Sequence, residues 1–299
     1  MTERRLAGGR EATSQAAEEA RAADWDSLPT DVIGLIVTVF SPFATKNLQA
    51  LRLISGHWRR SVDATVERLV VLSHKGRPDR SVSALLATVS RKFAALKALH
   101  VRVLRLGRDS MARVAHLSNL VSLDLGFTGI GDDCLPHVLR LPRLTSLDLG
   151  FTRVGNAGVG RLPALSDLST LCLSGTRVSS EALAHLSALP LTSLDLGHTR
   201  VGGPGFERIA DLAPLRRLGL GNSLVGDESL RHLAGLTNLA IIDLWHTFVS
   251  DSGVMHLSGL DGLRTLYLYD TQVSSLGVQH LSRLSNLSIH KEQEYWGWS

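Results

Sequence analysis

Cysteine is scarce in this chain of 299 residues. The two cysteines, Cys134 and Cys172, are too few for the disulfide frameworks that hold small secreted domains together. They also occupy different positions of the repeat pattern described below, which argues against a bridge between them. We therefore expect two free thiols and a reducing compartment, the cytoplasm or the nucleus.

Long apolar runs are missing too. The longest, residues 32–40, has about half of the ~20 apolar residues that a membrane-spanning helix needs. The start of the chain does not join a basic region to a long apolar core, so we expect neither a secretory signal nor a membrane anchor. Aromatic residues make up 5% of the chain, so its core must be built from aliphatic side chains.

Clustered charge and catalytic motifs are also lacking. The net charge is +4, and the lysines and arginines are scattered, which argues against a nucleic-acid-binding surface. The glycine-rich residues 202–205 are not followed by the Lys-Ser/Thr of a phosphate-binding loop. The sequence shows no recognisable Ser/His/Asp motif and no pocket that would raise the pKa of an aspartate. We therefore expect a protein that is not an enzyme and holds no cofactor.

What the chain has instead is a repeat. Seven leucines stand 24 residues apart, or 23 in one case, and each begins a segment with apolar residues at the same offsets. They are Leu120, Leu144, Leu168, Leu191, Leu215, Leu239 and Leu263. A period of about 20–29 residues with the form LxxLxLxx(N/C/T)x(L/V/I) is typical of leucine-rich repeats. A degenerate unit begins at Leu96, and the one deletion falls in a loop after Leu189, where it leaves the apolar positions in phase.

The positions within a repeat predict its local structure. With the leading leucine as offset 0, offsets 3 and 5 are apolar in every full unit, which indicates a short strand with inward side chains. Offset 8 is threonine or serine, whose hydroxyl we expect to bond to the backbone at the bend after the strand. Offsets 15, 18 and 21 are apolar and favour a short helix. We predict an α/β leucine-rich-repeat solenoid, with a parallel β-sheet on the concave face and short helices on the convex face.

Outward strand positions carry the function of such a solenoid, because packing does not constrain them. Our candidates for binding a protein substrate on the concave face are Asp124, Phe127, Asp148, Phe151, Asp195, His198, Asp243, Trp245, His246, Tyr267 and Tyr269. Aspartates on strands about 4.8 Å apart would repel one another, which suggests a basic partner segment; the other interpretation is a solvated face. The aromatic end, from Trp245 to Tyr269, is more selective, since exposed large aromatics are typical of binding hot spots.

A second column, at offset 17, holds arginine or histidine in every unit. It comprises Arg113, His137, Arg161, His185, Arg208, His232, His256 and His280. The ligands of a metal ion must converge on one point, whereas a column on the convex surface is spread out. We therefore expect a solvated face and no metal site.

Residues 25–65 have a different character from the repeats. Their apolar residues fall at helical spacing in three short stretches, too small a unit for a core of its own. Leu28-Pro29 near the start, and Ile54-Ser55 with Trp58-Arg59 near the end, resemble an F-box. The segment departs from that pattern in the middle, where "SPFATKNL" replaces the usual acidic start of the second helix.

The F-box resemblance, joined to the repeats, implies the substrate-recognition subunit of an SCF-type ubiquitin ligase. The F-box-like domain would bind the Skp-type adaptor of a cullin ligase, and the repeats would hold a protein substrate, with the chain a monomer within that complex. The adaptor-binding residues that the resemblance implies are Leu28, Pro29, Ile33, Ile36, Leu48, Leu51, Ile54 and Trp58. Two other interpretations remain open: a repeat scaffold for protein–protein interaction with a helical N-terminal cap, and a bacterial effector that carries an F-box into a host cell.

The predicted organisation has five parts. Residues 1–24 are a disordered leader, residues 25–65 the F-box-like helical domain, residues 66–95 a connector, residues 96–287 about eight repeat units, and residues 288–299 a C-terminal cap or tail. Within the connector we expect a strand over residues 67–73 and a helix over residues 81–93. Tyr295, Trp296 and Trp298 are expected to cover the open end of the core.

Overall fold

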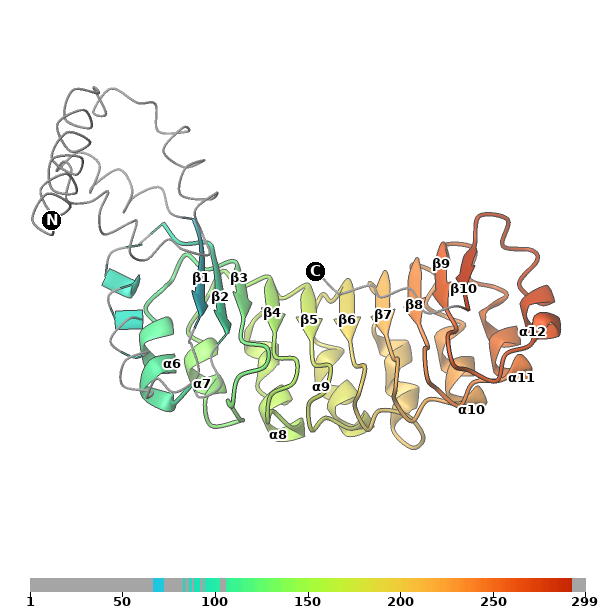
Figure 1. The fold of residues 1–299 in the computed structure, drawn as a ribbon, viewed down its shortest axis with the longest axis horizontal. Coiled ribbons are helices and arrows are strands. Elements are labelled where there is room, and N and C mark those ends of the chain that lie inside the picture. Colours follow the sequence, from blue (N-terminus) through green and yellow to red (C-terminus); the bar gives the residue numbers. More distant parts are fainter. Residues whose placement is uncertain are drawn as a thin grey trace, which may run out of the picture. The chain divides into compact units, whose positions relative to one another are not determined.

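The computed structural model describes residues 67–72, 83, 86–87, 89–91, 93, 95–102 and 106–291. The predicted leader, the F-box-like segment and the C-terminal aromatic residues lie outside this part of the chain. The chain divides into two compact units, residues 1–70 with 91–96 and residues 71–90 with 97–299. The full repeats lie in the second unit, coloured from green to red in Figure 1.

The strands form one ten-stranded sheet whose order follows the chain from β1 to β10. They are β1 (Arg68–Leu72), β2 (Ala98–Arg102), β3 (Ser122–Asp124), β4 (Ser146–Asp148), β5 (Thr170–Cys172), β6 (Ser193–Asp195), β7 (Arg217–Gly219), β8 (Ile241–Asp243), β9 (Thr265–Tyr267) and β10 (Ser288–His290). From β2 onward every neighbouring pair is parallel. The same offset of each repeat pairs with its equivalent in the next, as Leu123 does with Leu147. The predicted parallel sheet is confirmed.

The helices are short and lie on the opposite side of the repeats from the strands (Figure 1). They are α6 (Arg108–Val114), α7 (Leu135–Val138), α8 (Asn156–Val159), η2 (Leu162–Ala164), η3 (Ser180–Ala182), α9 (Leu183–Leu186), η4 (Phe206–Asp211), α10 (Asp227–Leu230), η5 (Arg231–Leu233), α11 (Asp251–Val254), η6 (Met255–Leu257) and α12 (Ser275–Gln279). Those marked η are 3₁₀ helices, which suit an apolar spacing of three residues. In the connector, residues 83, 86–87 and 89–91 are also helical, as predicted.

The core of the repeats is a stack of aliphatic layers between strands and helices. Offsets 3 and 5 are inward throughout, and their side chains are at most 1% exposed. The shortened repeat keeps this register, because Thr170 of β5 pairs with Ser193 of β6 across 23 residues while Leu194 and Leu196 stay fully buried. The deletion therefore leaves the core in phase, as predicted.

The sheet continues one strand further than the pattern of full repeats. Leu287 follows Leu263 by 24 residues, and β10 begins directly after it. The N–H of Ser288 donates to the C=O of Arg264 at 2.8 Å, which adds β10 to the edge of β9. The first residues of the segment that was expected to be only a cap or tail thus form the last strand.

Candidate functional site

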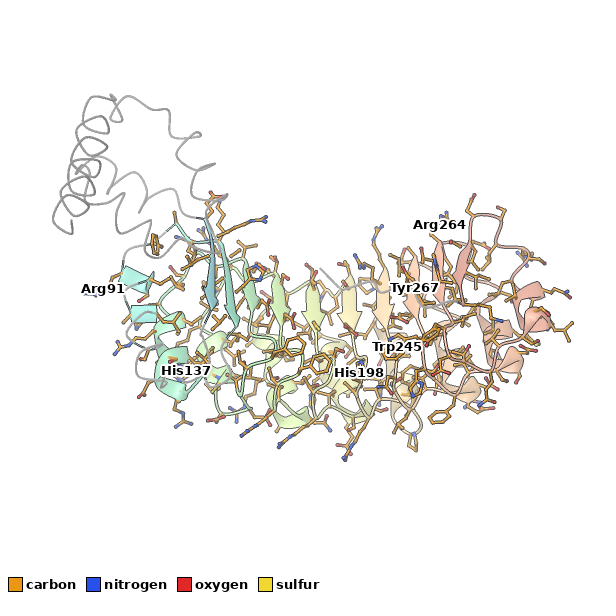
Figure 2. The ribbon with its side chains drawn as sticks, in the orientation of Figure 1. Arg91, His137, His198, Trp245, Arg264 and Tyr267 are labelled. Carbon is orange, nitrogen blue, oxygen red and sulfur yellow. The ribbon has the colours of Figure 1, made fainter. Side chains whose placement is uncertain are left out.

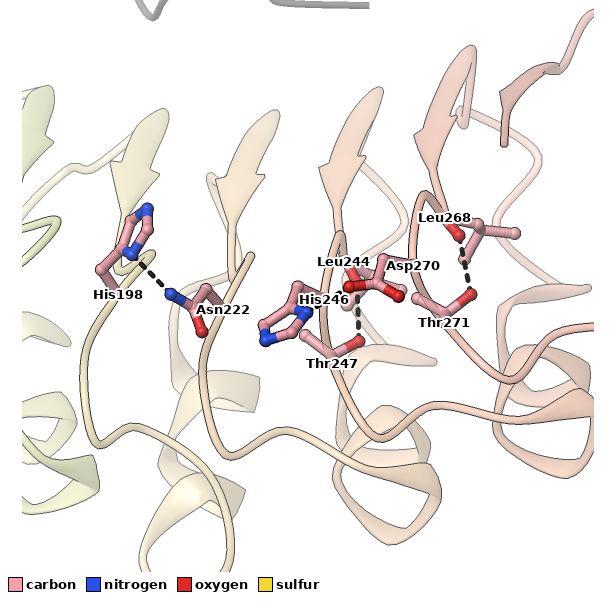
Figure 3. A network of polar contacts seen from close by, with 8 residues as sticks. All are labelled: His198, Asn222, Leu244, His246, Thr247, Leu268, Asp270 and Thr271. Carbon is pink, nitrogen blue, oxygen red and sulfur yellow. Dashed lines mark hydrogen bonds and ion pairs between the residues drawn. The ribbon is translucent and has the colours of Figure 1, made fainter. Parts of the chain in front are cut away.

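A hydroxyl closes the bend after each strand. At offset 8 each side chain donates to the backbone C=O three residues earlier, as Thr152 Oγ1 does to Leu149 at 2.6 Å. The full column is Thr128, Thr152, Thr176, Thr199, Ser223, Thr247 and Thr271. The predicted role of this column is confirmed, and Figure 3 shows it at Thr247 and Thr271.

The residue before each of these hydroxyls, at offset 7, has a left-handed backbone. The φ angle is +58° at Phe127, +54° at Phe151 and +49° at His246, and the other members are Gly175, His198, Asn222 and Asp270. This conformation is unfavourable for residues with a β-carbon and persists only where the surroundings impose it. Here the N–H of each of these residues from 127 to 246 donates to a C=O of the next repeat, at 2.7 Å from Phe151 to Ser174, for example.

The turned backbone brings a row of rings to the ends of the strands. We call Phe127, Phe151, His198, Trp245 and His246 the ring row. Phe127 and Phe151 stack with centroids 4.6 Å apart and planes 9° from parallel. The following centroid distances are 5.5, 5.1 and 5.9 Å, so each ring contacts the next across four repeats. Figure 2 shows His198 and Trp245 side by side in this row.

Glycines make room for these rings. A β-carbon at Gly175 would lie 2.5 Å from the ring of Phe151, and one at Gly221 would lie 2.0 Å from the indole of Trp245. Trp245 is therefore half-buried across the neighbouring repeat, whereas Phe127 and Phe151 are 58% and 43% exposed. The ring row is thus fixed in place before any partner arrives, and its phenylalanine end is the more accessible one.

Polar contacts extend the ring row toward the C-terminal repeats (Figure 3). Nδ1 of His198 lies 2.6 Å from Nδ2 of Asn222, and the imidazole of His246 pairs with the carboxylate of Asp270. Tyr267 instead stacks on His290, with centroids 4.9 Å apart. Of the predicted aromatic end, the structure thus brings Trp245 and His246 into one row and places Tyr267 in a separate pair, while Tyr269 is half-buried.

The aspartates at offset 4 support the same bend. One oxygen of each accepts the backbone N–H two residues on, at 2.8 Å for Asp124 and 2.7 Å for Asp148. The equivalent distances are 2.9 Å for Asp195 and 3.0 Å for Asp243. Asp124 and Asp195 are buried, so they offer little surface to a partner, and the basic partner stays a prediction. Sequence reasoning missed this role, although aspartate two residues before glycine is a signal for it.

Burial raises the pKa of these carboxyl groups. Removal from water raises the pKa of Asp195, and it raises that of Asp243 to about 6. The expectation that no aspartate here would have a raised pKa was wrong, because stacked strands exclude water even without a deep pocket. Burial also raises the pKa of the Cys172 thiol, which lies 3.7 Å from Asp195, so this free cysteine is a poor nucleophile.

On the helix side, polar residues at offset 12 join neighbouring repeats. Asp227 accepts hydrogen bonds from the N–H and Oγ of Ser250, at 2.7 and 2.6 Å, and from Oγ of Ser252 at 2.8 Å. Asp251 repeats the arrangement with Ser274. Burial alone would raise the pKa of Asp227, but these hydrogen bonds together hold it below its usual value. Sequence reasoning missed this column, whose signal is serine one repeat after each aspartate.

The offset 17 column does not form a site. Within the described residues no three His, Cys, Asp or Glu side chains lie close enough to hold a metal ion. His185, His256 and His280 are exposed, and His137 is half-buried with its Nδ1 enclosed and not hydrogen-bonded. In the same part of the chain no helix is long and apolar enough to cross a membrane.

The comparisons with known proteins agree with this geometry. The family model described as leucine-rich repeat matches residues 116–133, 141–162 and 189–210, and no F-box model matches. No curated protein sequence matches the chain. Internalin C2 of Listeria monocytogenes is similar, with 25% identity and a TM-score of 0.56 over 72% of this chain and 94% of its own.

A leucine-rich-repeat protein of Leptospira interrogans has a similar fold as well. It is 20% identical, with a TM-score of 0.53 over 79% of this chain and 57% of its own. Both likenesses lie in the repeats, where the period, the parallel sheet and the hydroxyl column coincide. The repeats of this protein are leucine-rich repeats, and they form a leucine-rich-repeat solenoid.

Proposed function

We propose that this protein is a substrate receptor, in which the repeats hold a protein partner and residues 25–65 bind the Skp-type adaptor of a cullin ubiquitin ligase. The general part of this proposal, a repeat scaffold for protein–protein interaction, is supported by the solenoid fold. The ligase part is supported by the resemblance of residues 25–65 to an F-box. The protein itself makes or breaks no bond; it raises the effective concentration of a substrate near the ligase.

The observation that carries the binding role is the exposure of the ring row. Phe127 and Phe151 keep 58% and 43% of their surfaces in water although the chain has few aromatic residues. Their stacking and the fixed left-handed backbone leave the side chains little freedom to lose on binding. Large, rigid aromatic side chains contribute most of the binding energy in many interfaces for this reason.

The adaptor part is tested by a pull-down with purified Skp adaptor. We expect the full chain to bind and a Pro29→Ala/Trp58→Ala variant to lose binding, because both residues belong to the F-box resemblance. A Pro214→Ala/Phe248→Ala variant changes the same kinds of residue in the repeats and should bind normally. Circular dichroism checks that each variant is folded.

The outcomes separate the interpretations. Loss of binding by the folded Pro29→Ala/Trp58→Ala variant alone supports the ligase receptor, acting in the cytoplasm or nucleus. Failure of the unmodified chain to bind the adaptor would remove the ligase part. The interaction scaffold with a helical N-terminal cap would then be the function that the repeats support.

A further inference from the structure

Three arginines occupy offset 9 in successive repeats. They are Arg153, Arg177 and Arg200, two residues after the ring row and beyond the buried hydroxyl of offset 8. Their backbone N–H groups donate to C=O groups of the preceding repeats, at 2.8 Å from Arg153 to Ile130 and from Arg177 to Val154. This ladder continues the sheet beyond the bend, so the arginines are held side by side at about 4.8 Å per repeat.

The charges of these arginines are not neutralised by their own surroundings. All three are exposed, and within the described residues none forms a side-chain hydrogen bond or an ion pair. Other arginines of the repeats do find partners, as Arg231 does with Glu228 at 2.8 Å. Like charges on adjacent strands repel and destabilise the sheet. A row that keeps three of them in register is therefore suited to a ligand of opposite charge.

The same offset changes from basic to apolar in the next two repeats. Leu224 and Phe248 follow Arg200 in the row and are 55% and 64% exposed. They line an open depression of about 370 Å³ together with Asn222, His246 and Asp270. One continuous edge thus presents three cations and then an apolar recess.

We propose that this edge row, made of Arg153, Arg177, Arg200, Leu224 and Phe248, binds an extended acidic segment of a protein. Carboxylates of the segment face the guanidinium groups, which bind them with two parallel hydrogen bonds, and an apolar side chain enters the recess. The inference rests on the proposed function only in taking the repeats to hold a protein. It differs from the basic partner predicted for the aspartate row, because those carboxylates already accept backbone N–H groups.

A protein segment fits this edge better than a nucleic acid does. The row has three cations and then ends in apolar residues, whereas a nucleic-acid site follows the phosphate backbone with charge along its length. The carboxylate of Asp270 at the recess, with 57% of its side chain exposed, would repel a phosphate there. An apolar side chain carries no such charge.

The test is fluorescence anisotropy with the purified full chain. The probe is a labelled peptide with three successive glutamates, two glycines and a phenylalanine, and we expect binding that weakens as salt is added. An Arg153→Gln/Arg177→Gln/Arg200→Gln variant should bind it about tenfold more weakly, since three exposed ion pairs are lost. Phe248→Ala should also weaken binding of this peptide, but not of one that lacks the phenylalanine.

The matched control is Arg113→Gln/Arg140→Gln/Arg161→Gln. These arginines are exposed on the helix side, and the control changes the net charge equally, so it should leave the affinity unchanged. Three results would overturn the inference: no binding of the acidic peptide, equal or tighter binding of a peptide with lysines for glutamates, or tighter binding of a single-stranded oligonucleotide. A chain that binds the Skp adaptor but not the acidic peptide would keep the proposed function and lose this inference.

Discussion

The carbonyl that ends each strand accepts two hydrogen bonds from the residue three positions later. In the third full repeat the C=O of Leu173 accepts the backbone N–H of Thr176 at 3.2 Å and its hydroxyl at 2.5 Å. Both groups are shielded from water, so a lost bond is not replaced by solvent. The hydroxyl therefore stabilises the bend that turns the ring row outward.

Replacing that hydroxyl tests its contribution. Thr176→Val keeps the shape of the side chain and removes the donor, so the free energy of unfolding in urea should fall by about 1 kcal/mol. Thr170→Val is the matched control, because Thr170 is half-buried on β5 and its hydroxyl makes no hydrogen bond within the described residues. An equal loss in both variants would mean that the bond in the bend adds nothing.

Asp243 makes the stability of the strand face depend on pH. Burial raises its pKa from 3.8 to about 6, so the folded chain holds this proton more tightly than the unfolded chain does. Stability from this residue is present below the unfolded pKa and is lost as pH rises toward 6. At pH 7.5 the ionised form costs about 2–3 kcal/mol, by the free energy of a pKa difference.

Asp243→Asn should remove that cost, because an amide oxygen still accepts the N–H of Trp245. Urea unfolding at pH 7.5 should show the variant to be more stable than the unmodified chain. The advantage should shrink as the pH falls through 6 and vanish near 4. A variant that is less stable at pH 7.5 would show that the carboxylate is needed in its charged form.

At the scale of elements, neighbouring repeats are joined on both sides of the core. Strands pair along one side, and on the other side Asp227, at the start of α10, binds the residues that begin α11. A helix of four residues is too short to be stable alone, so contacts of this kind fix its position. The helix side is therefore ordered by polar contacts as well as by leucines.

Removing the Asp227 contacts should weaken this junction. Asp227→Ala should lower the free energy of unfolding by about 1–2 kcal/mol at pH 7, since hydrogen bonds to a charged group are lost. The folded pKa of Asp227 lies below its unfolded value, so its stabilisation is present above about pH 4 and is lost as pH falls further. The difference between variant and unmodified chain should therefore shrink from pH 4 toward 2.5. Asp261→Ala, at an exposed site, is the control and should change little at either pH.

The sequence predicted the strands because burial alone selects leucine at offsets 3 and 5. It did not predict the left-handed residues after them, because phenylalanine and histidine rarely adopt that backbone and only Gly175, Asn222 and Asp270 in the column favour it. Candidate residues such as Phe127 were found for their chemistry, whereas their contacts depend on this turn. Arg153, Arg177 and Arg200 could have been found from their spacing alone.

At the scale of the whole molecule, the two sides of the solenoid carry different surfaces. The strand ends carry exposed rings, three unpaired arginines and an apolar recess, while the helix side has isolated apolar residues such as Met255, 47% exposed. The central claim is that protein partners bind at the strand ends. That claim does not depend on how the N-terminal segment is used.

Photo-crosslinking in cells of the native organism tests this claim most directly. The photoreactive residue p-benzoyl-phenylalanine replaces either Phe248, at the strand ends, or Met255, in η6 on the helix side; both positions are exposed, so the chain should stay folded. We predict that position 248 crosslinks to a discrete partner protein that position 255 does not capture. Equal crosslinking at the two positions, or crosslinking at 255 alone, would contradict the account.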